Sequence, residues 1–335
     1  MTSPRLDALC IGNAIVDVLG RVDDDFIVRE GLVKGEMRLV DAARSTEIYS
    51  RLGQVVRMSG GSAGNTAFGV GSLGGNVAYI GKVAADDLGR AYAHDLSSLG
   101  IAFATQPLEG GAPTAVSIIL ITPDGERTMN TYLGACQSLT VADVEADAEA
   151  IGAAATTYLE GYLWDPPAAK EAFRRAAEIA HANDRQVAIT LSDSFCVDRH
   201  RAEFLSLIRT GTVDIVFANE HELKALYETA DIATAIEALR QDCAVAAVTL
   251  GAEGSLAVTR EETHHVKATP IESVVDLTGA GDLYASGFLF GLARGLDLAG
   301  CASLGGLCAA EVIGQVGPRP MRSLSELASQ AGFAF

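Results

Sequence analysis

Two carboxylates, Asp276 and Asp282, bracket the stretch "DLTGAGD", and apolar residues follow it. Gly279, Ala280 and Gly281 carry almost no side chain at the point where a helix is predicted to begin. Unpaired backbone N–H groups and the aligned peptide dipoles attract anions to a helix N-terminus. An isolated Asp at this position would be read as a helix cap, but a cap does not require small neighbours. The stretch therefore predicts a site that binds a phosphoryl group and holds Asp282 beside it as a base.

A second stretch, "GGSAGN", has residue types that suit a ligand. Gly60 and Gly61 allow a ligand to approach the backbone closely, and Ser62 and Asn65 follow at the start of a predicted helix. The Asn65 amide offers both a donor and an acceptor. Taken alone, the same residues could form an ordinary helical N-terminal turn.

Other phosphate-binding patterns are excluded. A G-x-G-x-x-G match at Gly69, Gly71 and Gly74 ends a predicted helix, whereas a dinucleotide-binding loop follows a strand and opens a helix. These glycines instead indicate a helix that packs closely against a neighbour. The pattern G-x-x-x-x-G-K-[ST] does not occur, which excludes a P-loop.

Composition restricts the partners and the compartment. The 335 residues carry a formal net charge of −18, which argues against a nucleic-acid partner because such a surface needs a basic stripe. The six cysteines contain no C-x-x-C pair and are expected to be reduced thiols. Asn13 and Asp17 interrupt the apolar N-terminal stretch, so no signal peptide is expected, and no run is long enough to span a membrane. A cytoplasmic protein is expected.

Strand and helix patterns alternate along most of the chain and predict an α/β fold. A strand with a bend at Gly12 and Asn13 comes first, then a helix at 62–74, and the alternation resumes after residue 154. This order predicts a doubly wound, mostly parallel sheet with helices on both faces. Hairpins near 15–45 and 105–135 are expected to form a small projecting sheet, the second around the turn "PDGE".

The two stretches together resemble those of the ribokinase-like, or PfkB, family of carbohydrate and nucleoside kinases. "GGSAGNTA" and "DLTGAGD" stand in the family's order, with "GKVAADDLG", "GERTM", "NEHE" and "TLGAEGS" between them. "GNAIVDVLG" followed by "GGSAGN" is most similar to the adenosine kinase branch. The resemblance implies a single ribokinase-like kinase domain over residues 1–335, with a small β-sheet lid from about 13–45 and 102–135.

The resemblance also implies a reaction, the ATP-dependent phosphorylation of the 5′-hydroxyl of adenosine. Asp282 would be the general base, and Gly279, Ala280 and Gly281 would offer N–H groups to the transferring group. Asp17 would accept hydrogen bonds from the ribose diol. The residues implied to help it bind the substrate are Asn13, Gly60, Gly61, Ser62 and Asn65.

ATP and its cation are implied to lie beside these residues. "NEHE" matches the family's N-x-x-E element, in which Glu222 would order Mg²⁺ through water. Arg127 in "GERTM" would reach the ATP phosphates, which suit a planar cation. The other residues implied to bind ATP are Asn219, Thr249, Gly251 and Gly254. The family also leads us to expect K⁺ near the Asp276 loop.

The nucleobase pocket departs from the family pattern. Met37, Leu133, Ala135 and Tyr162 fall where adenosine kinases enclose the base, and Trp164 lies close by, but the family's pair of phenylalanines is missing. A kinase of a free sugar or sugar acid therefore remains an alternative. So does an inactive nucleotide- or sugar-binding regulator, although the intact "GAGD" opposes it. The expected partners are a small nucleoside or sugar and ATP, in a monomer or homodimer.

Overall fold

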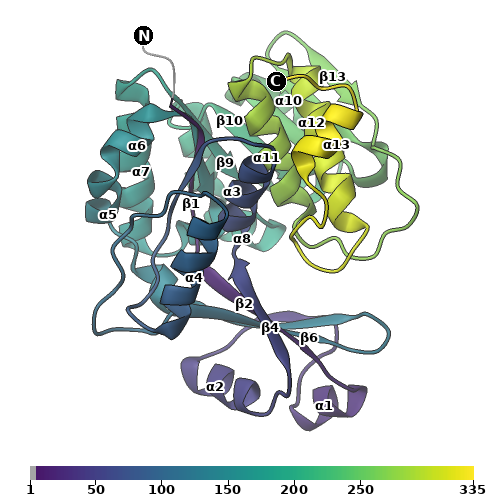
Figure 1. The fold of residues 1–335 in the computed structure, drawn as a ribbon. Coiled ribbons are helices and arrows are strands. Elements are labelled where there is room, and N and C mark those ends of the chain that lie inside the picture. The colour runs from purple at the N-terminus through teal and green to yellow at the C-terminus, as the bar shows by residue number, and fades with distance from the viewer. Residues whose placement is uncertain (1–4) are drawn as a thin grey trace.

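Two β-sheets divide the chain between a larger body and a smaller projecting part (Figure 1). The computed structural model describes residues 5–335. The larger sheet contains eight strands. In spatial order they are β13 (Thr263–Val266), β12 (Ser255–Thr259), β11 (Val245–Thr249), β10 (Ile215–Asn219), β9 (Gln186–Thr190), β8 (Ala154–Glu160), β1 (Leu6–Ile11) and β5 (Val77–Ile80). The six strands from β11 to β5 are parallel; β12 is antiparallel to β11, and β13 is antiparallel to β12.

Helices cover both faces of this sheet, because its strands are apolar on both sides. Leu9 and Ile11 belong to one hydrophobic cluster, and Ala8 and Cys10 belong to the other. One face packs against α3 (Ser62–Ser72), α4 (Asp87–Ser98), α11 (Ala280–Ala293), α12 (Leu298–Ile313) and α13 (Leu324–Gln330). The other packs against α5 (Val141–Ala146), α6 (Ala148–Ala153), α7 (Pro167–Ala182), α8 (Ser194–Arg209), α9 (Glu220–Leu226) and α10 (Ile232–Asp242). The predicted doubly wound α/β fold is confirmed.

The smaller sheet, called the lid here, has five strands in the order β3, β7, β6, β2, β4. They are β3 (Met37–Leu39), β7 (Arg127–Tyr132), β6 (Ala115–Ile121), β2 (Ile15–Arg21) and β4 (Val55–Gly60). The hairpin of β6 and β7 forms as predicted. The one predicted near 15–45 is wrong, since β2 and β3 each pair with other strands. Strand β4 lies outside both segments expected for the lid.

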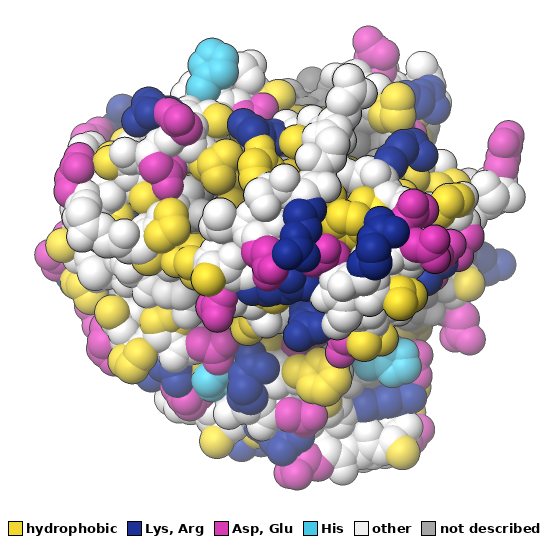
Figure 2. Space-filling model, turned by 90° about the horizontal axis from the view of Figure 1, so that it is seen from below, with side chains coloured by type: hydrophobic (Ala, Val, Ile, Leu, Met, Phe, Trp, Pro, Cys, Tyr) yellow, Lys and Arg dark blue, Asp and Glu magenta, His cyan; other side chains and the backbone are white. Residues whose placement is uncertain are grey.

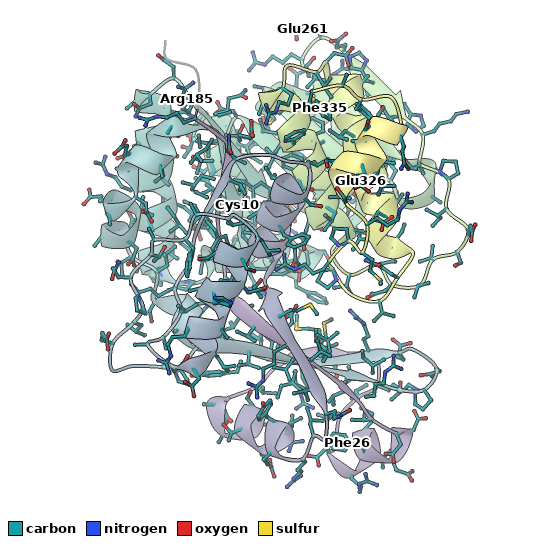
Figure 3. All side chains as sticks on the ribbon, in the orientation of Figure 1. Cys10, Phe26, Arg185, Glu261, Glu326 and Phe335 are labelled. Carbon is teal, nitrogen blue, oxygen red and sulfur yellow. The ribbon has the colours of Figure 1, made fainter. Side chains whose placement is uncertain are left out.

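The lid sheet has two faces of different character. Val16 and Val18 share the face that packs against Phe26 of α1 (Asp24–Arg29) and Ile48 of α2 (Ala42–Ser50). These helices lie on the side of the lid that faces away from the larger sheet (Figure 1; Phe26 is labelled in Figure 3). Because side chains alternate along a strand, Asp17 points to the opposite face, towards the larger body.

The surface carries both signs of charge, and the thiols are buried. On the face shown in Figure 2, acidic and basic side chains lie beside one another. Glu30, for example, pairs with both Arg44 and Arg51. All six cysteines are free and buried, Cys10 within β1 (Figure 3). Across residues 5–335, no helix has the length and apolar character needed to cross a membrane.

Helices α3 and α11 cross at very short range, and the G-x-G-x-x-G glycines explain how. A Cβ at Gly69 would lie 2.2 Å from Oγ of Ser286 on α11. A Cβ at Gly71, two residues on, would meet nothing closer than 3.7 Å. The match is therefore a packing feature at Gly69, as the sequence indicated.

We expect Gly69→Ala to lower the free energy of unfolding by about 3 kcal/mol, because overpacking would push the two helices apart. Urea unfolding monitored by circular dichroism would measure the change. Gly71→Ala is the matched control and should be neutral or slightly stabilising, since alanine is the better helix former. Equal effects of the two substitutions would contradict the close crossing.

Candidate active site

The stretch "DLTGAGD" forms a tight turn into α11. Gly279 has φ +80°, in the left-handed region, and Pro318 packs where a Cβ would be. Gly281 is exposed, and nothing lies within 4 Å of the position that its Cβ would take. The start of α11 is therefore open around Gly281, as an anion site at a helix N-terminus requires, whereas the N–H of Ala280 already donates to the carbonyl of Leu277 (3.2 Å).

Asp282 lies in the first turn of α11 and joins the two sequence motifs. Its carboxylate accepts hydrogen bonds from Oγ of Ser62 (2.7 Å) and Nδ2 of Asn65 (2.9 Å), both on α3. Burial raises the pKa of Asp282 to about 6, although these two donors and Arg319 oppose the rise. The carboxylate is thus oriented by two donors and is largely ionised at neutral pH.

The two glycines before α3 make room for polar groups of the first strands. A Cβ at Gly60 would lie 2.3 Å from a carboxylate oxygen of Asp17, and one at Gly61 would lie 2.1 Å from the carbonyl of Asn13. Gly61 also has φ +84°. Asp17 is 8% exposed, and burial raises its pKa to about 7. "GG" is therefore required for Asp17 and Asn13 to reach the start of α3.

Glu160, at the end of β8, was not recognised from the sequence. Its carboxylate accepts hydrogen bonds from Nδ2 of Asn13 and from the backbone N–H of Ala63, both 2.8 Å. Burial raises the pKa of Glu160 to about 7. Oδ1 of Asn13 and Oδ1 of Asn65 are buried and have no partner among the described residues. Glu160 thus orients Asn13 and leaves its acceptor free for a ligand.

Arg127 connects the lid to the "DLTGAGD" turn. Its Nη1 lies 2.7 Å from Oδ2 of Asp276 and 3.2 Å from Oγ1 of Thr278, and the side chains of Arg127 and Asp276 are 8% and 9% exposed. Asp276 also accepts from Thr278 and from the Gly317 N–H. Its two oxygens are thus engaged by donors and do not fit as ligands for K⁺. Nε and Nη2 of Arg127 have no partner in the described chain.

Residues expected to bind ATP lie at the carboxyl ends of neighbouring parallel strands, where ligands of such sheets bind. Asn219 ends β10, and its register partner Thr249 ends β11. Gly251 and Gly254 follow in the turn before β12, both with positive φ. Glu222 is 5% exposed and is held by the N–H and side-chain amide of Asn219.

The environment of Glu222 suits an indirect contact with a metal ion. Burial raises its pKa to about 7, and Asp193 adds to the rise. No group of three His, Cys, Asp or Glu residues arranged for a metal occurs within residues 5–335. Mg²⁺ retains several waters and is commonly held by one or two carboxylates with substrate phosphates. A single buried carboxylate fits that role through water.

The residues expected around a nucleobase separate into two groups. Met37 on β3 is 47% exposed, and Leu133 and Tyr162 are partly exposed. Tyr162 donates its hydroxyl to the carbonyl of Ser192. Ala135 and Trp164 have no exposed surface, so neither side chain is open to a ligand in this structure. Trp164 packs against Phe173 and Phe204 in the core.

Arg319 is a further residue at the site that the sequence did not single out. It follows Pro318 in the loop "GPRP" and lies close enough to Asp17 and Asp282 to lower the pKa of both carboxyls. The Gly-Pro-Arg-Pro sequence, a rigid turn around one cation, was the signal that could have indicated it.

We expect Asp276→Asn to lower the free energy of unfolding by about 3–5 kcal/mol, because it leaves the buried Arg127 guanidinium without its counter-charge. Thermal unfolding would measure the loss. Asp87→Asn is the control: Asp87 pairs with Arg90, but its side chain is 93% exposed, so no measurable change is expected. A similarly small effect at Asp276 would show that the pair does not hold the lid.

Comparisons with known proteins agree with this geometry. The family model described as "pfkB family carbohydrate kinase" matches residues 28–324. The adenosine kinase from Sinorhizobium meliloti is 57% identical, with a TM-score of 0.90 over 98% of this chain and 100% of that chain. A probable sugar kinase protein from Rhizobium etli CFN 42 is 52% identical, with a TM-score of 0.91 over 98% and 99%. The adenosine kinase of Saccharomyces cerevisiae (strain ATCC 204508 / S288c) is 26% identical over 95% of this chain and 97% of that protein. The chain therefore belongs to the pfkB family of carbohydrate kinases and is an ATP-dependent kinase that transfers a phosphoryl group to a hydroxyl.

Proposed function

We propose that this kinase phosphorylates the 5′-hydroxyl of adenosine to form AMP, with Asp282 as general base. One observation carries the proposal: Ser62 and Asn65 orient Asp282 at the N-terminus of α11. Asn65 also has a buried acceptor, Oδ1, without a partner among the described residues. The six free, buried thiols support a reducing compartment, so we place this purine-salvage activity in the cytoplasm.

The acceptors suit a substrate with adjacent hydroxyl groups. The carboxylate of Asp17 can accept both protons of a vicinal diol. Oδ1 of Asn13 and Oδ1 of Asn65 are buried without partners, and an unpaired buried acceptor is costly until a ligand supplies a donor. Ribose hydroxyls supply such donors.

The start of α11 suits the phosphoryl group. As the 5′-hydroxyl attacks, Asp282 takes its proton, and Gly279 and Gly281 offer N–H groups to the transferring group, while the N–H of Ala280 donates to the carbonyl of Leu277. The pKa of about 6 leaves Asp282 ionised at neutral pH and still close enough to that pH to accept a proton efficiently.

ATP would lie along the ends of β10 and β11, with Arg127 offering Nε and Nη2 to its phosphates. Mg²⁺, when bound, would neutralise charge on those phosphates. Glu222 would accept hydrogen bonds from waters of that ion, consistent with its burial and its bonds to Asn219. A monovalent cation such as K⁺ would have to use oxygens other than those of Asp276.

The face of the lid that carries Asp17 favours a nucleoside over a free sugar. Register places Asp17, Ser117 and Thr131 in one row across β2, β6 and β7. An apolar group shares that face: Leu19, Met37, Met58, Ile119 and Met129. Methionines adapt to flat ligands, and a nucleobase would cover this surface, which a free sugar would leave exposed. The likeness to the Rhizobium etli protein keeps a sugar kinase as the alternative.

The first test is ADP release with Mg²⁺-ATP and K⁺ in the presence of adenosine, inosine, guanosine, ribose or fructose. We expect turnover with adenosine at low concentration, and a loss in kcat of about 10²–10⁴-fold or more in Asp282→Asn. Glu326→Gln is the matched control, because Glu326 is also in the first turn of a helix but lies in α13 (Figure 3). Turnover with a sugar but not with adenosine would leave the role of Asp282 as base intact and show that the substrate is a sugar. No turnover with any acceptor would refute both the role of Asp282 and the proposed substrate.

The apolar side of the lid makes a separate prediction. We expect Met37→Ser to raise KM for adenosine about tenfold, because it removes apolar contact with the base, and to leave kcat/KM for ribose unchanged. Arg38→Ser is the control, since Arg38 follows on β3 with its side chain on the other face. Equal losses for adenosine and ribose would mean that Met37 acts through the fold of the lid.

A further inference from the structure

The loop between α12 and α13 packs against the "DLTGAGD" turn, residues 276–282. The N–H of Gly317 donates to Oδ2 of Asp276 (2.8 Å). Pro318 occupies the space beside Gly279, where a Cβ would lie 2.6 Å from its own. These two contacts fix the position of the next residue, Arg319.

Arg319 reaches from this loop to the end of the lid strand β4. Its Nη2 donates to the carbonyl and to Oγ of Ser59, the latter at 2.7 Å. The guanidinium carbon lies 4.2 Å from the centre of the Phe68 ring on α3, a favourable cation–π contact. Ser59 in turn donates its N–H to Asp95 of α4 (2.8 Å). Arg319 thus joins the C-terminal loop, the lid, α3 and α4.

Ser59 directly precedes Gly60 and Gly61, the turn by which the lid enters α3. Asp17 and Asn13 lie so close to this turn that the turn cannot shift unless these two residues shift as well. Any motion at Ser59 therefore changes the position of Asp17 relative to Asp282, which is anchored through Ser62, three residues after Ser59.

We propose that Arg319 is a positioning residue of the phosphotransfer site, which fixes Ser59 and the Gly60–Gly61 turn and so sets Asp17 against Asp282. The inference rests on the proposed function for its catalytic consequence. In described residues 5–335, Arg319 makes no ion pair with either carboxylate, so it acts on them through the backbone and through its field.

The charges around Arg319 support this role. It faces Asp17 on β2, Tyr92 and Asp95 on α4, and Asp282 on α11. Its charge lowers the pKa of both Asp17 and Asp282, against the burial that raises them. Arg127 on the lid acts on Asp17 in the same direction. Nη1 of Arg319 is buried without a partner.

The test compares Arg319→Met, Arg319→Lys and, as control, Arg322→Gln, which changes a neighbouring arginine whose side chain contacts Gln330. We expect Arg319→Met to lower kcat/KM about 10–100-fold and to move the acid limb of its pH profile to higher pH. Loss of the cation raises the pKa of the two carboxyls, so they ionise later. Arg319→Lys should restore the acid limb without restoring the full rate, because lysine lacks the planar fork.

Hydrogen exchange of the amides of residues 59–65 in the substrate-free protein gives a readout that does not need turnover. Exchange should be faster in Arg319→Met and unchanged in Arg322→Gln. An Arg319→Met enzyme with the wild-type pH profile, or with wild-type exchange, overturns the inference. An inactive wild type with faster exchange in Arg319→Met refutes the proposed function and leaves the anchoring of the turn in place.

Discussion

The site depends on one packing constraint: the N-termini of α3 and α11 must lie next to each other. Their crossing is close because Gly69 faces Ser286, and at their N-termini Asp282 accepts hydrogen bonds from Ser62 and Asn65. The polar residues at the start of α3 therefore lie beside the first turn of α11. A wider crossing would separate the acceptors on α3 from the anion-binding turn of α11.

This arrangement buries several carboxylates, which is unfavourable for their charged forms. Hydrogen bonds offset the burial of some, and nearby positive charges offset the burial of others. Glu160 and Glu222 receive hydrogen bonds from residues that they in turn orient, Asn13 and Asn219. Asp17 has few donors of its own and relies on the charges of Arg127 and Arg319. A buried charge is tolerated only when it is paired or hydrogen-bonded. Asp17 is the least satisfied of these three, as expected of a group that accepts hydrogen bonds from a ligand.

The sequence predicted the parts of the site whose meaning is local. Glycines and polar residues in "GGSAGN" and "DLTGAGD" require particular backbone conformations wherever they occur, so their role could be inferred without contacts. Glu160 and Arg319 are single charged residues whose role arises only from partners far along the chain. Trp164 could not be assigned, because an aromatic residue suits a pocket and a core equally well in sequence. Strand β4 was missed because its six residues show no clear alternation.

An ion pair joins the lid to the "DLTGAGD" turn, so the position of the lid is coupled to the position of that turn. Arg127 on β7 uses Nη1 for Asp276, on the loop that leads into the glycine turn, and leaves Nε and Nη2 buried and unpaired. Unpaired buried donors are costly, so this contact alone does not satisfy the guanidinium. Arg319, on the loop between α12 and α13, also has one nitrogen unpaired. Both arginines lower the pKa of Asp17, and Arg319 also lowers that of Asp282, while each guanidinium retains a buried donor for an anion. Under the proposed function, the phosphates of the nucleotide would supply the acceptors that Nε and Nη2 of Arg127 lack.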